Sequence, residues 1–302
     1  MSSETTGARA ASGGLSALAR PSGGFAMVAI DQREALRAMF VERQPSPVPD
    51  AQLTAFKLAA ARALSPHASG LLVDRQFALD QVVSQHAIAD GCGLIAAGDH
   101  FIATGRELVA DTEIDEAVIP ADVAAQGAVA MKLLVIYRPD GDPTSRIAMV
   151  EDFVDRCHRA GLLSIIEPIS RAPHDGRSWD ADEGILAAAR ELGSRGADLY
   201  KCEVPLHGQG NPADIGRRCA ILTESIASPW VVLSSGVPPD EFPAAVEIAC
   251  REGASGFLAG RAVWASALDR FIDSDDPERE LRQLAVPRLH RLCDLVDTSV
   301  RT

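Results

Sequence analysis

Lys201 is the first candidate for chemistry in this chain, because it is a cation inside the otherwise apolar run 199–205. A desolvated lysine loses its charge readily, and a neutral amine is the nucleophile that attacks a ketone to form a Schiff base. A single lysine in an apolar run is more often a strand-edge side chain that reaches solvent. The polar residues of the neighbouring runs therefore decide how Lys201 is interpreted.

Two further residues occur in comparable apolar runs. Lys132 begins the run 132–137, and Glu167 ends the run Ser164-Ile165-Ile166-Glu167-Pro168. If both lysines face one interior, each should lower the pKa of the other and leave one amine neutral. Glu167 beside them could shuttle protons, or it could neutralise Lys132, and the two roles are compatible.

The elements that must position these residues alternate in type along the chain. Short β-type runs are separated by longer helical stretches, which is typical of a parallel sheet. Eight such runs in 302 residues predict an α/β fold, a (β/α)₈ TIM barrel, in one domain. We expect residues 1–21 to form a flexible N-terminal extension and 22–302 the barrel domain. The runs are 25–31, 70–74, 93–98, 131–137, 162–168, 199–205, 230–236 and 255–261.

Helix signals fall between these runs. Asp180 followed by Glu183 forms a capping-box pattern, and Gly161 suits the position after a helix over 147–160. A closing helix is expected over 277–296, which Pro287 should kink or divide.

The carboxyl ends of the last two runs carry small polar residues and one arginine. In a parallel barrel the active site lies at the carboxyl ends of the strands, and the loops after strands seven and eight often bind phosphate. Glycine lets the backbone approach an anion, and an arginine donates a forked pair of hydrogen bonds to it. The predicted anion site contains Ser234, Ser235, Gly236, Gly260 and Arg261.

The other run ends supply candidates for the opposite end of a substrate. Gln32, Arg33 and Arg138 could bind a second anion or sugar hydroxyls, with Asp31 orienting them. The pair Asp99 and His100 is better interpreted as structural or solvated than as catalytic. The histidines lack HExxH or similar spacing, and no fingerprint for a nucleotide is present, so we expect no metal and no cofactor.

Composition limits the partners and the compartment. The net charge is −13 without a cluster of basic and aromatic residues, which argues against nucleic acid or an anionic membrane as partner. No apolar run reaches about 18 residues and the start lacks a secretion signal, so a cytoplasmic protein is expected. Six scattered cysteines without CxxC spacing are expected to be reduced.

Several long stretches carry a family resemblance that covers the chain from about residue 22 to residue 296. They closely resemble the sulfofructosephosphate aldolases, within the class I aldolase group that also contains tagatose 1,6-bisphosphate aldolase. The stretches are residues 22–34, 132–135, 164–168, 198–201, 233–237 and 256–265, the last reading Gly-Phe-Leu-Ala-Gly-Arg-Ala-Val-Trp-Ala. Cys202 departs from the aliphatic residue expected after the lysine.

The resemblance implies a reaction and a set of roles. It implies cleavage of 6-deoxy-6-sulfofructose 1-phosphate to dihydroxyacetone phosphate and 3-sulfolactaldehyde, in sulfoquinovose degradation, by a homo-oligomer. It matches the Schiff-base lysine to Lys201, the second lysine to Lys132 and the acid/base glutamate to Glu167. The partner expected is therefore a small-molecule ketose 1-phosphate.

Three alternatives stay open at this level. The same chemistry could act on tagatose or fructose 1,6-bisphosphate. A non-catalytic sugar-phosphate-binding barrel would need the anion site but not the paired amines. A barrel isomerase could use Glu167 as a base without covalent chemistry.

Overall fold

A closed barrel of eight parallel strands forms the centre of the molecule. The computed structural model describes residues 14–300, and the strand order around the barrel is β1-β10-β9-β8-β7-β6-β3-β2. Each of the eight predicted runs overlaps one barrel strand, so the TIM barrel is confirmed. The strands are β1 Phe25–Ala29, β2 Gly70–Val73, β3 Gly93–Ala97, β6 Ala128–Tyr137, β7 Leu163–Ser170, β8 Leu199–Cys202, β9 Trp230–Val232 and β10 Gly256–Ala259.

Alternation along each strand separates two layers of side chains. On β7, Ile165 packs inside the barrel, whereas Ile166 packs in the outer layer. Glu167 follows on the inner side, and Ile169 continues that side in a small apolar cluster near the carboxyl end. The inner face therefore changes from apolar to charged and back along the strand.

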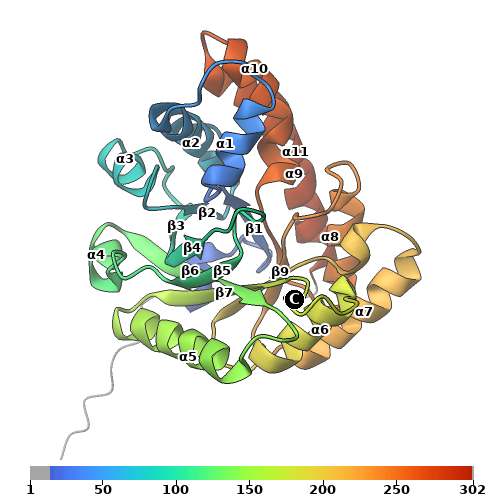
Figure 1. Cartoon of the computed structure of the whole chain (residues 1–302). Helices are drawn as coiled ribbons and strands as arrows, with labels where there is room; N and C mark the ends of the chain where they lie inside the picture. Colours follow the sequence, from blue (N-terminus) through green and yellow to red (C-terminus); the bar gives the residue numbers. More distant parts are fainter. Residues whose placement is uncertain (1–13, 301–302) are drawn as a thin grey trace, which may run out of the picture.

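Helices surround the barrel, with α1, α2 and α11 on one side and α5, α6 and α7 on another (Figure 1). Asp180 accepts hydrogen bonds from the amides of Asp182 and Glu183, and Gly161 has a φ of 75°, as the capping patterns predict. The helices are α1 Glu34–Val41, α2 Asp50–Leu64, α3 Leu79–Ser84, α4 Pro120–Ala125, α5 Pro143–Arg159, α6 Ala181–Leu192, α7 Pro212–Ser225, α8 Phe242–Arg251, α9 Arg261–Trp264, α10 Leu268–Asp273 and α11 Pro277–Ser299, with 3₁₀ turns η1 Gly14–Leu18, η2 Ser65–His67, η3 Pro205–Gly208 and η4 Ala265–Ala267.

The closing helix α11 is continuous, so the expectation that Pro287 divides it is wrong. It packs against α2 and α8. Leu281, Leu289 and Leu292 are buried in this packing, which compensates for the hydrogen bond that a proline nitrogen cannot donate. None of the helices within residues 14–300 is long and apolar enough to cross a membrane.

A small antiparallel hairpin follows β3 and was not predicted. Its strands are β4 Asp99–Ile102 and β5 Asp111–Ile114, joined by the loop 103–110. These strands have four residues each and little apolar content, so the sequence carries only a weak strand signal. The hairpin adds one wall to the cavity described below.

Part of the predicted N-terminal extension packs against the barrel. Residues 1–13 of that segment lie outside the described residues. The turn η1 covers the amino ends of β2 and β3, and Leu18 is fully buried there. A side chain on either Gly70 or Gly93 would meet Leu18, so these glycines make room for it. Leu18 therefore belongs to the floor of the barrel.

Candidate active site

A cavity of about 590 Å³ opens at the carboxyl ends of the barrel strands. This is the end at which parallel barrels place their active sites. Nine of the residues predicted from sequence line it: Asp31, Gln32, Arg33, Glu167, Lys201, Ser234, Ser235, Gly260 and Arg261.

The centre of the cavity holds a carboxylate between two amines. Lys201 Nζ lies 2.7 Å from Glu167 Oε1, and Lys132 Nζ lies 3.1 Å from Glu167 Oε2. Lys201 and Glu167 are 4% and 6% exposed, whereas Lys132 is fully buried beneath them. Strand alternation explains the arrangement, because the three residues face inward from the adjacent strands β6, β7 and β8.

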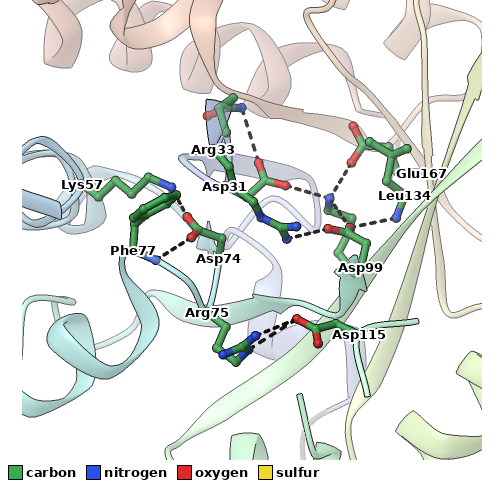
Figure 2. A network of polar contacts seen from close by, with 12 residues as sticks. Asp31, Arg33, Lys57, Asp74, Arg75, Phe77, Asp99, Asp115, Leu134 and Glu167 are labelled. Atoms are coloured by element: carbon green, nitrogen blue, oxygen red, sulfur yellow. Dashed lines mark hydrogen bonds and ion pairs between the residues drawn. The ribbon is translucent and has the colours of Figure 1, made fainter. Parts of the chain in front are cut away.

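Lys132 is a stable cation in this arrangement. Its Nζ also lies 2.7 Å from carboxylate oxygens of both Asp31 and Asp99. Figure 2 shows Asp31, Asp99 and Glu167 gathered in this network. Burial lowers the pKa of Lys132, but the three carboxylates raise it above its ordinary value. The expectation of a lowered pKa for Lys132 is therefore wrong, because the neighbouring carboxylates raise it.

Asp31 is held as an anion by the same charges. Burial raises the pKa of its carboxyl, but the charges of Lys132 and Lys201 overcome that effect and hold the pKa well below its usual range. Asp31 follows β1, which lies across the barrel from the strand β7 that carries Glu167. The site thus joins residues that are distant in sequence.

Asp99 connects the amine cluster to Arg33. One of its oxygens accepts a hydrogen bond from Arg33 Nη2 at 2.8 Å, and the other contacts Lys132 and accepts from the Leu134 amide at 3.0 Å (Figure 2). The Arg33 guanidinium also lies 4.1 Å from the centre of the Phe101 ring. Arg33 is therefore a neutralised and stacked cation rather than a free one.

A second wall, at the carboxyl ends of β7, β9 and β10, contains two cations and several polar groups. Arg261 Nη2 donates to Ser235 Oγ at 3.0 Å. Partial burial and the charge of Arg171 lower the pKa of Arg261, so the two arginines act on the same space. A Cβ on Gly260 would lie 2.6 Å from the Ala29 carbonyl oxygen, so no side chain fits there. This wall suits an anion.

Sequence reasoning missed Arg171, which lines the cavity just beyond the end of β7. The predicted run ended at Pro168, but the strand continues to Ser170 and strand alternation then turns Arg171 inward. Glu167, Ile169 and Arg171 are spaced by two residues, so the alternation that places Glu167 on the inner side also predicts Arg171 there.

Two predicted binding residues do not line the cavity. Arg138 donates to the Glu107 carboxylate and to the carbonyl oxygens of Ala110 and Ala172, so its guanidinium fixes the hairpin loop instead. Gly236 has a φ of 77° and packs against the His207 ring. Asp31 contacts Lys132 and, at 3.4 Å, the Gln32 side chain, and no contact to Arg138 is seen within residues 14–300.

The described part of the chain offers no group of three or more histidine, cysteine, aspartate or glutamate residues that could hold a metal ion. All six cysteines are free thiols. His100 lines the cavity, but its partner in the sequence, Asp99, is engaged by Arg33 and Lys132. The amines and carboxylates of the cluster are the ionisable groups in direct contact with one another here.

A closed parallel barrel with an amine in contact with a carboxylate in its upper cavity is the arrangement expected of a class I aldolase. Residues 25–266 match the model of the DeoC/LacD family of aldolases. The chain belongs to this class I aldolase family.

Two relatives agree with this assignment, and a solved structure shares the fold. A tagatose 1,6-diphosphate aldolase from Streptococcus pyogenes serotype M1 is 26% identical over 281 residues, which cover 83% of this chain and 84% of the relative. A tagatose 1,6-diphosphate aldolase from Listeria innocua is 25% identical over 319 residues, covering 94% and 90%. A fructose-bisphosphate aldolase from Plasmodium falciparum shares the fold with a TM-score of 0.68 at 12% identity, covering 95% of this chain and 93% of that one.

Proposed function

We propose that this aldolase forms a Schiff base through Lys201 and cleaves 6-deoxy-6-sulfofructose 1-phosphate to dihydroxyacetone phosphate and 3-sulfolactaldehyde. The observation that carries the chemistry is the 2.7 Å contact between Lys201 Nζ and Glu167 Oε1 in the cavity wall. This distance allows Glu167 to take the proton that the amine must lose before it attacks.

The reaction begins with attack of the Lys201 amine on the C2 ketone of the sugar. Glu167 then protonates the carbinolamine hydroxyl, which leaves as water and gives the iminium. Loss of the C4 hydroxyl proton to Glu167 breaks the C3–C4 bond, and the electron pair enters the iminium to give an enamine. Protonation at C3 and addition of water release dihydroxyacetone phosphate and restore the amine.

The two walls of the cavity fit anions of different charge. Arg171 and Arg261 lie on one wall with no carboxylate in ion-pair contact within residues 14–300, which suits a phosphate that carries nearly two charges. At the end of β1, which neighbours β10, Arg33 is already paired with Asp99, and Gln32 is neutral. One partly neutralised cation suits the single charge of a sulfonate. This difference supports a C1 phosphate and a C6 sulfonate.

The test of the chemistry is reduction with borohydride in the presence of dihydroxyacetone phosphate. We expect a covalent adduct on Lys201, and Lys201→Met should abolish both the adduct and cleavage. Lys57→Met is a control, because Lys57 is also buried but contacts Asp74 outside the cavity. An adduct on another residue, or cleavage by Lys201→Met, would overturn the mechanism.

The second candidate is the same reaction on tagatose or fructose 1,6-bisphosphate, which the names of the two relatives favour. Comparing kcat/KM for the 6-sulfonate and the 6-phosphates of one sugar decides between them. A kcat/KM at least tenfold higher for a 6-phosphate would overturn the sulfonate assignment and leave the Schiff base intact.

A non-catalytic sugar-phosphate-binding barrel and a barrel isomerase predict different products. The first gives no turnover, and the second leaves the six-carbon chain uncut and gives no adduct with borohydride. Product analysis by mass spectrometry distinguishes both from an aldolase, which converts one six-carbon sugar to two three-carbon products.

A further inference from the structure

Glu203 is a buried carboxyl that no step of the proposed mechanism uses. It follows Lys201 by two residues, so both side chains face the inner side of the barrel. Its side chain is 5% exposed, and it does not line the cavity. A residue that does not touch the substrate can act only through another group.

The group that Glu203 contacts is the backbone at the end of β7. The pairing of β7 with β8 is seen at Ile165 and Ile166, but β7 continues to Ser170. Glu203 Oε2 accepts a hydrogen bond from the Ser170 amide at 2.7 Å. The carboxyl thus supplies the acceptor that the strand ladder no longer provides, and a buried amide without one would be costly.

The next residue is Arg171, whose side chain lines the cavity. Its own amide donates to the Tyr137 carbonyl oxygen of β6 at 2.9 Å. The Ser170 side chain points the other way, since a Cβ on Gly184 of α6 would lie only 1.9 Å from Ser170 Oγ. The backbone from which Arg171 enters the cavity is therefore held by Glu203 on one side and β6 on the other.

The acceptor role does not require a negative charge. Burial, together with the charges of Glu167 and Asp182, raises the pKa of Glu203 to about 7, although the Ser170 amide and Arg171 oppose this. The carboxyl is therefore partly protonated near neutral pH. A protonated carboxyl still has a carbonyl oxygen that accepts from the Ser170 amide.

We infer that Glu203 is a positioning residue whose carboxyl holds the backbone at Ser170, so that Arg171 points at the phosphate of the substrate. The inference rests on the proposed function only in taking the C1 phosphate as the ligand of Arg171. It adds a residue that sets affinity for the phosphate without touching it.

The experiment separates the reach of the side chain from its charge. Glu203→Gln keeps the length of the side chain and an acceptor oxygen but removes the charge. Glu203→Asp keeps the charge but shortens the side chain, so that its oxygen no longer reaches the Ser170 amide. Calorimetry gives the dissociation constants of dihydroxyacetone phosphate and of unphosphorylated dihydroxyacetone. We expect Glu203→Asp to weaken binding of the phosphate ester about tenfold, which is the loss of one good hydrogen bond, with dihydroxyacetone unchanged. Glu203→Gln should stay within about twofold of the native chain.

Arg171→Met shows whether the effect passes through Arg171. It should weaken phosphate-ester binding at least as much as Glu203→Asp, and the double variant should bind no more weakly than Arg171→Met alone. Additive losses in the double variant would overturn the inference. Equal weakening for both ligands, or a loss in Glu203→Gln as large as in Glu203→Asp, would also overturn it.

Two further results keep the two proposals distinguishable. If circular dichroism shows that Glu203→Asp does not fold, Glu203→Gln still decides, since a loss beyond twofold contradicts the acceptor role and native-like affinity supports it. Failure of borohydride to trap the native chain would overturn the Schiff base. The dissociation constants would still test Glu203, because they require only binding of the phosphate.

Discussion

At the scale of single residues, the buried cluster is balanced in charge. Asp31, Asp99 and Glu167 supply three negative charges, and Lys132, Lys201 and Arg33 supply three positive ones. A buried ion is tolerated only when it is paired, so each of these side chains depends on the others. A proton passed from Lys201 to Glu167 stays within the cluster, so the net charge of the cluster does not change.

Lys132→Met should therefore damage both stability and catalysis. It removes the cation that lies 2.7 Å from Asp31 and leaves Asp99 paired with Arg33 alone, and we expect a loss of about 3–5 kcal/mol in the free energy of unfolding. Glu167 also loses its contact with Lys132, which fixes the carboxylate beside Lys201, so kcat should fall about 100-fold or more. Urea unfolding and steady-state kinetics measure the two effects. The double variant with Asp99→Asn should recover part of the stability, and a further loss there would contradict the charge argument.

The pH dependence of stability should reveal Glu203 independently of catalysis. Its pKa is about 7 in the folded protein and its ordinary value is 4.5, so between these values the folded state binds the proton that the unfolded state has released. Stability therefore falls as the pH rises through this window, by at most about 3 kcal/mol. Glu203→Gln removes this cost. Urea unfolding should show the variant gaining stability over the native chain from pH 5 to pH 8, and a constant difference would contradict the raised pKa.

At the scale of elements, the sequence predicted the strands and most of the polar residues at their carboxyl ends. Apolar runs bounded by turn residues were enough for that, because barrel strands are short and buried. The sequence could not show that Asp99 joins Lys132 to Arg33, since that contact depends on barrel closure. Arg138 was misplaced because it belongs to a strand end but is turned toward the hairpin loop, an element without a clear sequence signal.

The turn after β10 should tolerate no side chain at Gly260. A Cβ there would lie 2.6 Å from the Ala29 carbonyl oxygen and 2.9 Å from Gln32 Nε2. Gly260→Ala must therefore displace the end of β1, at a cost of about 1–3 kcal/mol, and should also raise KM because Gln32 lines the cavity. Gly105→Ala is the matched control, since nothing lies within 4 Å of a Cβ at that position. Thermal unfolding and KM measured side by side test this, and equal effects of the two substitutions would contradict it.

At the scale of the whole molecule, the barrel divides stability and chemistry between its two ends. The floor is apolar, with Leu18 packed beside the inward-facing residues Met27, Ile95 and Leu199. The charged cluster lies between this apolar layer and the cavity at the carboxyl ends of the strands. Because the polar residues gather at one end, the other end can be optimised for packing alone.

This division predicts opposite effects for two leucines at the two ends. Leu18 is fully buried in the floor, so Leu18→Ala should lower the free energy of unfolding by about 2–5 kcal/mol and leave kcat per folded molecule unchanged. Leu108 is 52% exposed in the hairpin loop and lines the cavity, so Leu108→Ala should change stability by less than about 0.5 kcal/mol but alter KM. Urea unfolding and kinetics on both variants measure the contrast. A loss of kcat in folded Leu18→Ala would contradict this division, because it would mean that packing of the floor controls the geometry of the amines.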